Sequence, residues 1–191
     1  MRARLMAAAT RLFAQQGYES TSLKQIVELA DTSIGNCYFY FQNKEAILLA
    51  IAEELRTEIA GVVDAAIASA PPGPAQLYAA VYAGTLAVLE RADVARFALS
   101  DSAHPAIRPL TIKMFTARVE AALRGYPELL SNWPEATPQL VAAAWHGGAS
   151  HVIEAAIEGR ITEPHTQIAD FVARWNMRAL GAEGGGKGSR H

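Results

Sequence analysis

The sequence predicts an all-α protein of about nine helices. Apolar residues make up 51% of its 191 residues, which is enough to bury a core and far from a disordered composition. Alanine is abundant and apolar residues recur at helical spacing, whereas the runs of Val, Ile and Thr that are typical of strands are missing. Together these observations favour a bundle of helices.

The first two helices have clear end signals. One is expected over residues 2–16, because apolar residues repeat at helical spacing there and Gly17 is a natural stop. The second is expected over residues 22–30, where Ser22 can cap the helix and Gln25 can complete a capping box.

A tight turn and a third short helix follow. The pair Asp31-Thr32 breaks the helical pattern, since short polar side chains favour turns. Ser33 then caps a helix over residues 34–40. Two short helices around a tight turn are the helix-turn-helix plan, whose second helix enters the DNA major groove.

Six further helices are expected, at residues 44–69, 75–91, 93–99, 102–124, 138–158 and 164–180. Asn43 and Asp93 are the expected caps of the first and third of these helices. The fourth is expected to start at Ser102–Pro105, with Pro109 near its beginning, and the fifth at Thr137, which precedes a proline at the first helical position. Gly159 stops the fifth of these helices, and the Gly-rich tail at 181–191 is expected to be disordered.

The first 50 residues carry a set of residues in one register: Ala8–Phe13, Gly17-Tyr18, Thr21-Ser22, Ile26, Ala30, Ser33, Gly35, Tyr38–Phe41 and Lys44–Leu48. This pattern resembles the DNA-binding region of the TetR/AcrR family of bacterial repressors. Two positions depart from that pattern: Asp31 stands where the family usually has Gly, and Ile34 where a basic or polar residue is common. Asp tolerates the left-handed conformation that the turn needs, so Ile34 bears on DNA sequence preference rather than on the fold.

The resemblance implies three segments. Residues 1–48 would form the helix-turn-helix DNA-binding domain, residues 49–180 a helical domain for ligand binding and dimerisation, and residues 181–191 the tail. It implies as partners a double-stranded DNA operator, a second copy of the chain and an unidentified small-molecule effector, with no cofactor.

Base reading is expected at the start of the helix over residues 34–40. Asn36 can pair bidentately with adenine, and the aliphatic Ile34 suits a thymine methyl group. Gly35 has no side chain and would let the helix backbone come close to the base pairs. Ser33, the capping residue, is the fourth candidate for base reading. This predicts a readout that leans on A·T pairs.

Phosphate contacts are expected from the residues that follow. Tyr38 and Tyr40 are two apart and point to different sides of their helix, so periodicity alone leaves both a core and a DNA-facing role open. The resemblance favours DNA for both tyrosines and implies that Lys44 meets a phosphate. Lys24 is either a further DNA contact or a solvated lysine.

The lone cysteine, Cys37, excludes an intramolecular disulfide and a cysteine zinc cage, and is compatible with a reducing cytosol. Its side chain is either a small buried hydrophobe or a thiol sensor. Neither a signal peptide nor a membrane span is expected, because the sequence has no apolar run of about 18 residues. We therefore expect a cytoplasmic protein with no membrane partner.

An effector cavity is the second candidate site. Aromatic residues at helical spacing in the later helices line either a cavity or an ordinary core. His151, Glu154 and Glu158 share a helix face and are either metal ligands or, as we expect, a solvated or interface face. The candidate cavity residues are Tyr78, Tyr82, Phe97, Phe115, Trp145 and His146.

The dimer interface is the third candidate site. Gly147 and Gly148 lie inside a long helix, where each costs about 1 kcal/mol relative to alanine. The resemblance places the last two helices in a four-helix bundle made by two chains, with Phe171, Val172 and Trp175 filling the seam. The glycines either admit a neighbouring helix or leave room for an effector.

The function predicted from these features is a homodimeric repressor that a small-molecule effector releases from its operator. The net charge of −2 argues against a bulk nucleic-acid coat protein, since a sequence-specific binder needs only a local basic face. No catalytic constellation is recognisable, so an enzyme is not expected. Two alternatives stay open: a helical-bundle carrier or enzyme without a DNA role, and a DNA-binding regulator without a ligand.

Overall fold

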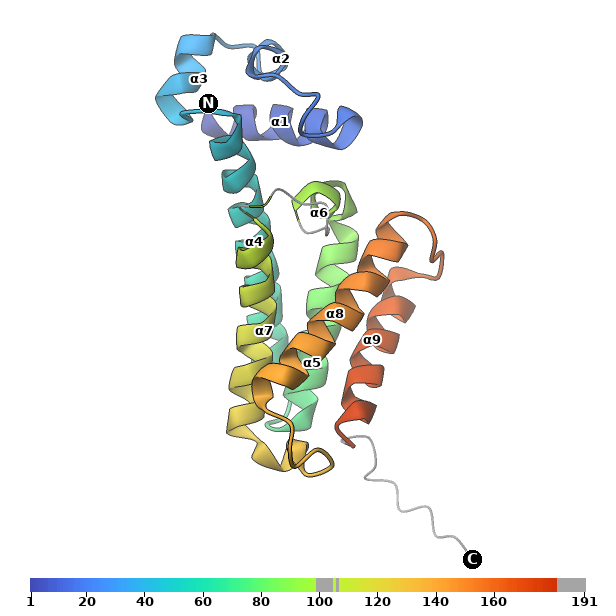
Figure 1. Cartoon of the computed structure of the whole chain (residues 1–191). Coiled ribbons are helices and arrows are strands. Elements are labelled where there is room, and N and C mark those ends of the chain that lie inside the picture. The colour runs from blue at the N-terminus through green and yellow to red at the C-terminus, as the bar shows by residue number, and fades with distance from the viewer. Residues whose placement is uncertain (99–104, 106, 182–191) are drawn as a thin grey trace, which may run out of the picture. The chain divides into compact units, whose positions relative to one another are not determined.

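A computed structural model describes residues 1–98, 105 and 107–181, and within these residues it is built from α-helices and one 3₁₀ helix, with no strand (Figure 1). The all-α prediction of about nine helices is confirmed. The helices are α1 (Arg2–Gln16), α2 (Leu23–Leu29), α3 (Ile34–Tyr40), α4 (Lys44–Ser69), α5 (Pro74–Glu90), α6 (Ala92–Ala98), α7 (Arg108–Gly125), η1 (Pro127–Leu130), α8 (Pro138–Ile157) and α9 (His165–Ala179).

The chain folds as two compact units. Unit 1 contains Met1–Glu58 and Arg91–Thr111, and unit 2 contains Ile59–Glu90 and the chain from Ile112 onward. Both α4 and α7 pass from one unit into the other. The functional boundary expected at residue 48 stays a prediction.

Unit 1 packs α1 against α2 and α6. Phe13 of α1 lies at its centre, where its ring contacts those of Tyr18 and Phe97 with centroid distances of 5.3 and 5.5 Å. Burial of such apolar side chains is the main source of the stability of this unit. Its other buried side chains include Leu5, Ala9, Ile26, Val27, Ile47 and Leu48.

Unit 2 is organised around the packing of α5 along α9, with α8 against both helices. One buried cluster joins side chains from four helices and η1: Leu77, Leu123, Leu129, Trp145, Met177 and Leu180. No helix in the described ranges is both long enough and apolar enough to cross a bilayer.

The predicted start of α7 is wrong. It was expected at Ser102–Pro105, but the helix begins at Arg108. An earlier start would place Pro109 in the helix interior, where it lacks the N–H for the helical hydrogen bond and its ring clashes with the carbonyl of Pro105. Starting at Arg108 puts Pro109 in the first turn, where proline is tolerated. Ser102 to His104 lie outside the described residues.

Other end signals are mostly confirmed. The side chain of Thr137 accepts a hydrogen bond from the backbone N–H of Leu140, and that of Asn43 from Ala46 at 2.8 Å. Asp93 is not the cap of α6 but lies in its first turn, where a carboxylate suits the helix dipole. The short helix η1 was not predicted, and residues 182–191 of the expected tail are outside the described part.

Candidate nucleic-acid interface

The amino end of α2 is closed by the expected capping box. The hydroxyl of Ser22 accepts from the backbone N–H of Gln25 at 3.3 Å, and the Gln25 side chain accepts from the backbone N–H of Ser22 at 2.8 Å. Both bonds satisfy N–H groups that have no partner within the helix. The start of the helix-turn-helix is therefore fixed by its local sequence.

The turn between α2 and α3 has the geometry that its sequence implied. Asp31 adopts the left-handed conformation, with φ of 49°, and is the only non-glycine residue with positive φ among those described. Arg4, from α1, donates to the carbonyl oxygens of Ala30 at 2.7 Å and Asp31 at 3.3 Å, and lies 3.4 Å from the Asp31 carboxylate. No local pattern in the sequence indicates this contact, because Arg4 and Asp31 are 27 residues apart.

The start of α3 is ordered by two polar contacts. The hydroxyl of Ser33 accepts from the backbone N–H of Asn36 at 3.1 Å, which confirms the predicted cap. The side-chain amide of Asn36 donates to the Thr32 hydroxyl at 2.8 Å. Because a primary amide carries two N–H donors and a carbonyl oxygen, Asn36 keeps groups with which to read a base edge.

One face of α3 is buried and the rest is open. Cys37 is fully buried and Phe41 is 4% exposed, so both side chains belong to the core of unit 1. Burial raises the pKa of the Cys37 thiol, so the thiol is predominantly protonated at neutral pH. The outer side chains are exposed: Ile34 44%, Tyr38 55%, Phe39 81% and Tyr40 39%.

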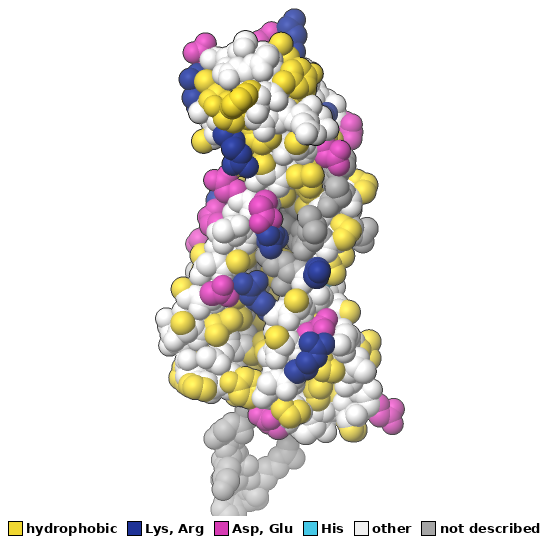
Figure 2. All heavy atoms as spheres, turned by 90° about the vertical axis from the view of Figure 1, so that its left-hand side faces the viewer, with side chains coloured by type: hydrophobic (Ala, Val, Ile, Leu, Met, Phe, Trp, Pro, Cys, Tyr) yellow, Lys and Arg dark blue, Asp and Glu magenta, His cyan; other side chains and the backbone are white. Residues whose placement is uncertain are grey.

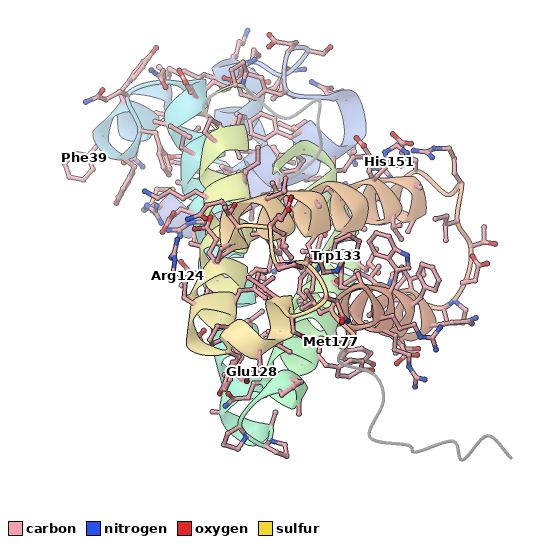
Figure 3. All side chains as sticks on the ribbon, turned by 60° about the horizontal axis from the view of Figure 1, so that its bottom comes forward. Phe39, Arg124, Glu128, Trp133, His151 and Met177 are labelled. Carbon is pink, nitrogen blue, oxygen red and sulfur yellow. The ribbon has the colours of Figure 1, made fainter. Side chains whose placement is uncertain are left out.

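Phe39 is the exposed residue that sequence reasoning missed. Its side chain projects away from the ribbon at the outer edge of unit 1 (Figure 3). The signal that would have found it is its spacing of four from Gly35, which puts both on one side of the helix.

Lys44, at the start of α4, bonds within the chain. Its ammonium donates to the carbonyl oxygens of Tyr18 at 2.6 Å and Glu19 at 3.4 Å, and lies 4.1 Å from the centre of the Tyr18 ring. The pKa of the Tyr18 hydroxyl is raised, first by burial and then by the charges of Glu45 and Glu19. Lys44 thus ties α4 to the loop that follows α1.

Two further cations near the helix-turn-helix, Lys24 and Arg2, are exposed. Lys24 reaches to 4.0 Å from Glu28, and its side chain is 84% exposed, so this pair adds little stability. The guanidinium of Arg2 lies 5.4 Å from the centre of the Phe41 ring, beside the carboxyl end of α3. In the space-filling view, hydrophobic side chains on the α3 end of unit 1 have Lys or Arg side chains next to them (Figure 2).

Residues 5–51, which contain this helix-turn-helix, match the model of the bacterial regulatory proteins of the tetR family. This amino-terminal part of the chain is a helix-turn-helix domain of the TetR family. The HTH-type transcriptional regulator YuxN of Bacillus subtilis is 45% identical over 47 residues. That match covers 25% of this chain and only 16% of YuxN.

Solved structures extend the likeness to the rest of the TetR-family fold. A putative TetR-family regulator from Syntrophomonas wolfei superposes with a TM-score of 0.80 at 13% identity, over 96% of each chain. The transcriptional regulator FadR from Bacillus subtilis, solved in complex with stearoyl-CoA, has a TM-score of 0.75 at 17% identity, over 93% of this chain and 98% of FadR. Identities this low show a shared fold and no more.

Five of the six candidate effector residues lie in unit 2. Tyr78 and Tyr82 stack with their ring centres 6.0 Å apart, and Phe115 stacks on His146 at 5.7 Å. Trp145 is 5% exposed in the buried cluster of unit 2. Phe97 lies in unit 1, where its ring packs on Phe13.

The Tyr78 hydroxyl also donates to the Asp170 carboxylate at 2.5 Å, which joins α5 to α9. Arg174 donates to the same carboxylate oxygen at 2.9 Å. These two hydrogen bonds lower the pKa of Asp170, with the bond from Tyr78 as the larger cause. Burial, followed by the contact with Asp170, raises the pKa of Tyr78.

The candidate dimer residues divide into outward and inward ones. Phe171 is 58% and Trp175 51% exposed on α9, whereas Val172 is buried within unit 2. A side chain added at Gly148 would lie 3.2 Å from the Trp175 ring, so this glycine gives that ring its place beside α8. A side chain added at Gly147 would meet no described atom within 4 Å.

The candidate metal ligands His151, Glu154 and Glu158 do not form a cluster that could hold a metal ion. Among the described residues no cluster of three His, Cys, Asp or Glu side chains is arranged to hold a metal ion. His151 is exposed on the surface of α8, and Glu158 pairs with Arg160 at 2.6 Å (Figure 3).

Proposed function

We propose that this TetR-family chain is a transcriptional repressor that binds a pseudo-palindromic operator as a homodimer and is released by a small-molecule effector. The observation that carries the proposal is the open outer face of α3. Its amino end is capped, its inner face is anchored by Cys37, and its exposed side chains stand where a recognition helix needs them.

Base reading falls to the first turn of α3. Asn36 can pair with adenine through its amide, and Ile34 can contact a thymine methyl group. A side chain added at Gly35 would meet no described atom within 4 Å, so the backbone there is open to close approach. Ser33 stays engaged as the cap and orients these residues.

Phosphate contacts come from the flanks. The phenol groups of Tyr38 and Tyr40 are exposed, and a hydroxyl donor to a phosphate positions the protein without reading sequence. Lys24 and Lys44 supply positive charge, and Lys44 must exchange its carbonyl partners for a phosphate to do so.

A homodimer follows from the operator geometry, because one recognition helix reads only one half-site. The exposed aromatic side chains of Phe171 and Trp175 on α9 support a seam there, as large apolar groups in adjacent turns favour burial against a partner. Gly148 lets α8 approach the Trp175 ring, Gly147 leaves open space for a neighbouring helix, and Val172 is buried on the inner side of α9.

An effector would act through unit 2, where Tyr78, Tyr82, Phe115, Trp145 and His146 lie. FadR of Bacillus subtilis, which shares the fold, holds stearoyl-CoA. Release requires only that the effector prefer the dimer whose recognition helices no longer match the groove spacing.

The test is selection of bound sequences from random duplex DNA by the full chain. The expected product is a palindromic motif whose half-sites are about 10 base pairs apart, centre to centre, or a multiple of that spacing. The matched variant is Gly35→Glu, which adds a negative charge to the open face where space is available. It should keep its helical content and enrich no motif. If the unaltered chain enriches no motif either, a DNA-free carrier or enzyme replaces this proposal.

A further inference from the structure

Phe39 occupies the most outward direction of the recognition helix. Successive residues of an α-helix are about 100° apart, so residues two before and two after Cys37 lie about 160° from it. Cys37 points into the core. Gly35 and Phe39 therefore share the strip opposite the core, one turn apart, and Gly35 leaves its own part of that strip bare.

The Phe39 side chain is uncovered to an unusual degree. At 81%, it is the most exposed large hydrophobic side chain in the described part of the protein. Its ring meets that of Tyr40 edge-on, with centroids 5.0 Å apart, which fixes one side of the ring and leaves its outer side open (Figure 3). A phenyl ring has no hydrogen-bonding group, so it cannot contact a phosphate as Tyr38 and Tyr40 can.

The surroundings match duplex DNA better than an apolar protein surface. Phenol groups lie on both sides of Phe39 in the sequence, the Arg2 guanidinium stands at the carboxyl end of α3, and exposed Lys24 lies on α2. An apolar centre with hydroxyl and cationic flanks complements a groove whose walls are phosphates. The one apolar group on the base edges of the major groove is the thymine 5-methyl group.

We propose that Phe39 is a specificity-determining residue that recognises thymine by packing its ring on the 5-methyl group in the major groove. The inference rests on the proposed DNA-binding function and assigns a further base position to it. The contacted thymine lies one helical turn along α3 from the base approached at Gly35.

The experiment uses the full chain and the best duplex from the random-sequence selection. Each thymine is replaced in turn by deoxyuridine, which removes only the methyl group and keeps every hydrogen-bonding group of the base. At the contacted thymine, the dissociation constant should rise about fourfold per half-site and about sixteenfold when both half-sites are changed.

Three variants assign the effect. Phe39→Ala should bind the thymine and uracil duplexes equally, because its methyl partner is gone. Phe39→Leu should retain part of the discrimination, since it keeps an apolar side chain. Ile34→Ala should retain the discrimination at this position and lose it at another, if Ile34 reads its own methyl group.

The outcomes separate the two proposals. Equal binding of every uracil duplex by the unaltered chain overturns the role of Phe39 and leaves DNA binding standing. Discrimination between thymine and uracil that persists in Phe39→Ala, or that disappears only in Ile34→Ala, also overturns the role of Phe39 and leaves DNA binding standing. Failure to enrich any sequence removes the proposed function, and the role of Phe39 falls with it. Unaltered DNA binding by Phe39→Ala at every position would point to a protein partner for this side chain.

Discussion

Lys44 can serve its own chain or a DNA phosphate, and the two roles leave different signatures. Its ammonium donates to two carbonyl oxygens and lies over the Tyr18 ring, so its charge is partly satisfied before DNA arrives. A phosphate carries a full negative charge and forms a stronger, charge-assisted hydrogen bond than a carbonyl. We therefore expect the ammonium to move to the phosphate in the complex.

Lys44→Ala should weaken binding to all duplexes about equally and should reduce the salt dependence. The slope of log affinity against log salt should fall by about one unit, because one fewer counterion is released. Binding titrations at several salt concentrations measure the slope. Lys113→Ala, an exposed cation of unit 2, is the matched control and should leave the slope unchanged. A weakened complex with an unaltered slope would mean that Lys44 acts only as a tie between α4 and the loop after α1.

Asn36→Ala should relax the preference at one base pair, at a cost of about 1–3 kcal/mol for the preferred sequence. Repeating the sequence selection with the variant measures this. Thr32→Val is the informative partner, because it removes the hydroxyl that holds the Asn36 amide at 2.8 Å. It should lower affinity while keeping the same preferred base. If Asn36→Ala selects the original motif unchanged, Asn36 is not a base reader.

At the scale of elements, the Tyr78–Asp170 hydrogen bond joins α5 to α9 in the packing that organises unit 2. Its strength depends on pH because Asp170 accepts best when ionised. Asp170 has a lowered pKa, so its contribution is fully present above the ordinary aspartate pKa of about 3.9 and is lost as the pH falls through the lowered value. Tyr78 has a raised pKa, so its contribution is lost only as the pH rises past about 10.

Tyr78→Phe should lower the thermal midpoint by about 2–4 °C at neutral pH, since it deletes one hydrogen bond at a helix contact. The difference from the unaltered chain should be constant above about pH 4 and should narrow as the pH falls through the lowered pKa of Asp170. Thermal unfolding followed by circular dichroism between pH 3 and 8 measures both effects. The control Tyr82→Phe removes a hydroxyl from the stacked ring and leaves the hydrogen bond from Tyr78 to Asp170 intact. Its thermal midpoint, relative to that of the unaltered chain, should therefore not show this pH dependence. A constant difference for Tyr78→Phe across the range would exclude ionised Asp170 as the relevant partner.

Elements were predictable wherever neighbouring residues decide them. Ser22 with Gln25, Ser33 and Thr137 mark helix starts by bonds that span three residues, and each was read from the sequence. The start of α7 was predicted too early because Pro105 and Pro109 both suit the first turn of a helix. Only one of them can lie there, and in the structure it is Pro109. Periodicity alone left Tyr38 and Tyr40 open between a core and a DNA-facing role; the family resemblance favoured the outer face, where both are exposed, and Phe39 was missed.

Contacts between distant segments were not predictable. Arg4 reaches Ala30 and Asp31, and Lys44 reaches Tyr18, across 25 or more residues. Such bonds depend on how helices pack, and no local pattern specifies them. The same reason explains Phe97, whose spacing suits a cavity as well as it suits its observed place against Phe13.

At the scale of the whole molecule, the proposed repressor depends on two chains. A single chain leaves Phe171 and Trp175 about half exposed on α9, which is costly for a protein that has no partner there. Both side chains lie on the outer side of a helix whose inner side is buried by Val172 and its neighbours. In the single chain the Trp175 ring also packs on α8 at Gly148, so Trp175→Glu loses that contact as well as any seam, whereas Phe171→Glu changes a side chain that is 58% exposed.

Phe171→Glu combined with Trp175→Glu should give a folded monomer that has lost operator binding. In a dimer seam the two carboxylates would be buried without partners, at a cost of several kcal/mol. One half-site supplies too few contacts to hold a monomer on the operator at physiological salt. Sedimentation measures the mass, circular dichroism the helical content, and titration of the selected duplex the affinity. Val62→Glu, an exposed apolar position of α4, is the control and should stay dimeric. An intact dimer of the double variant, still bound to the operator, would place the seam elsewhere than on the outer face of α9.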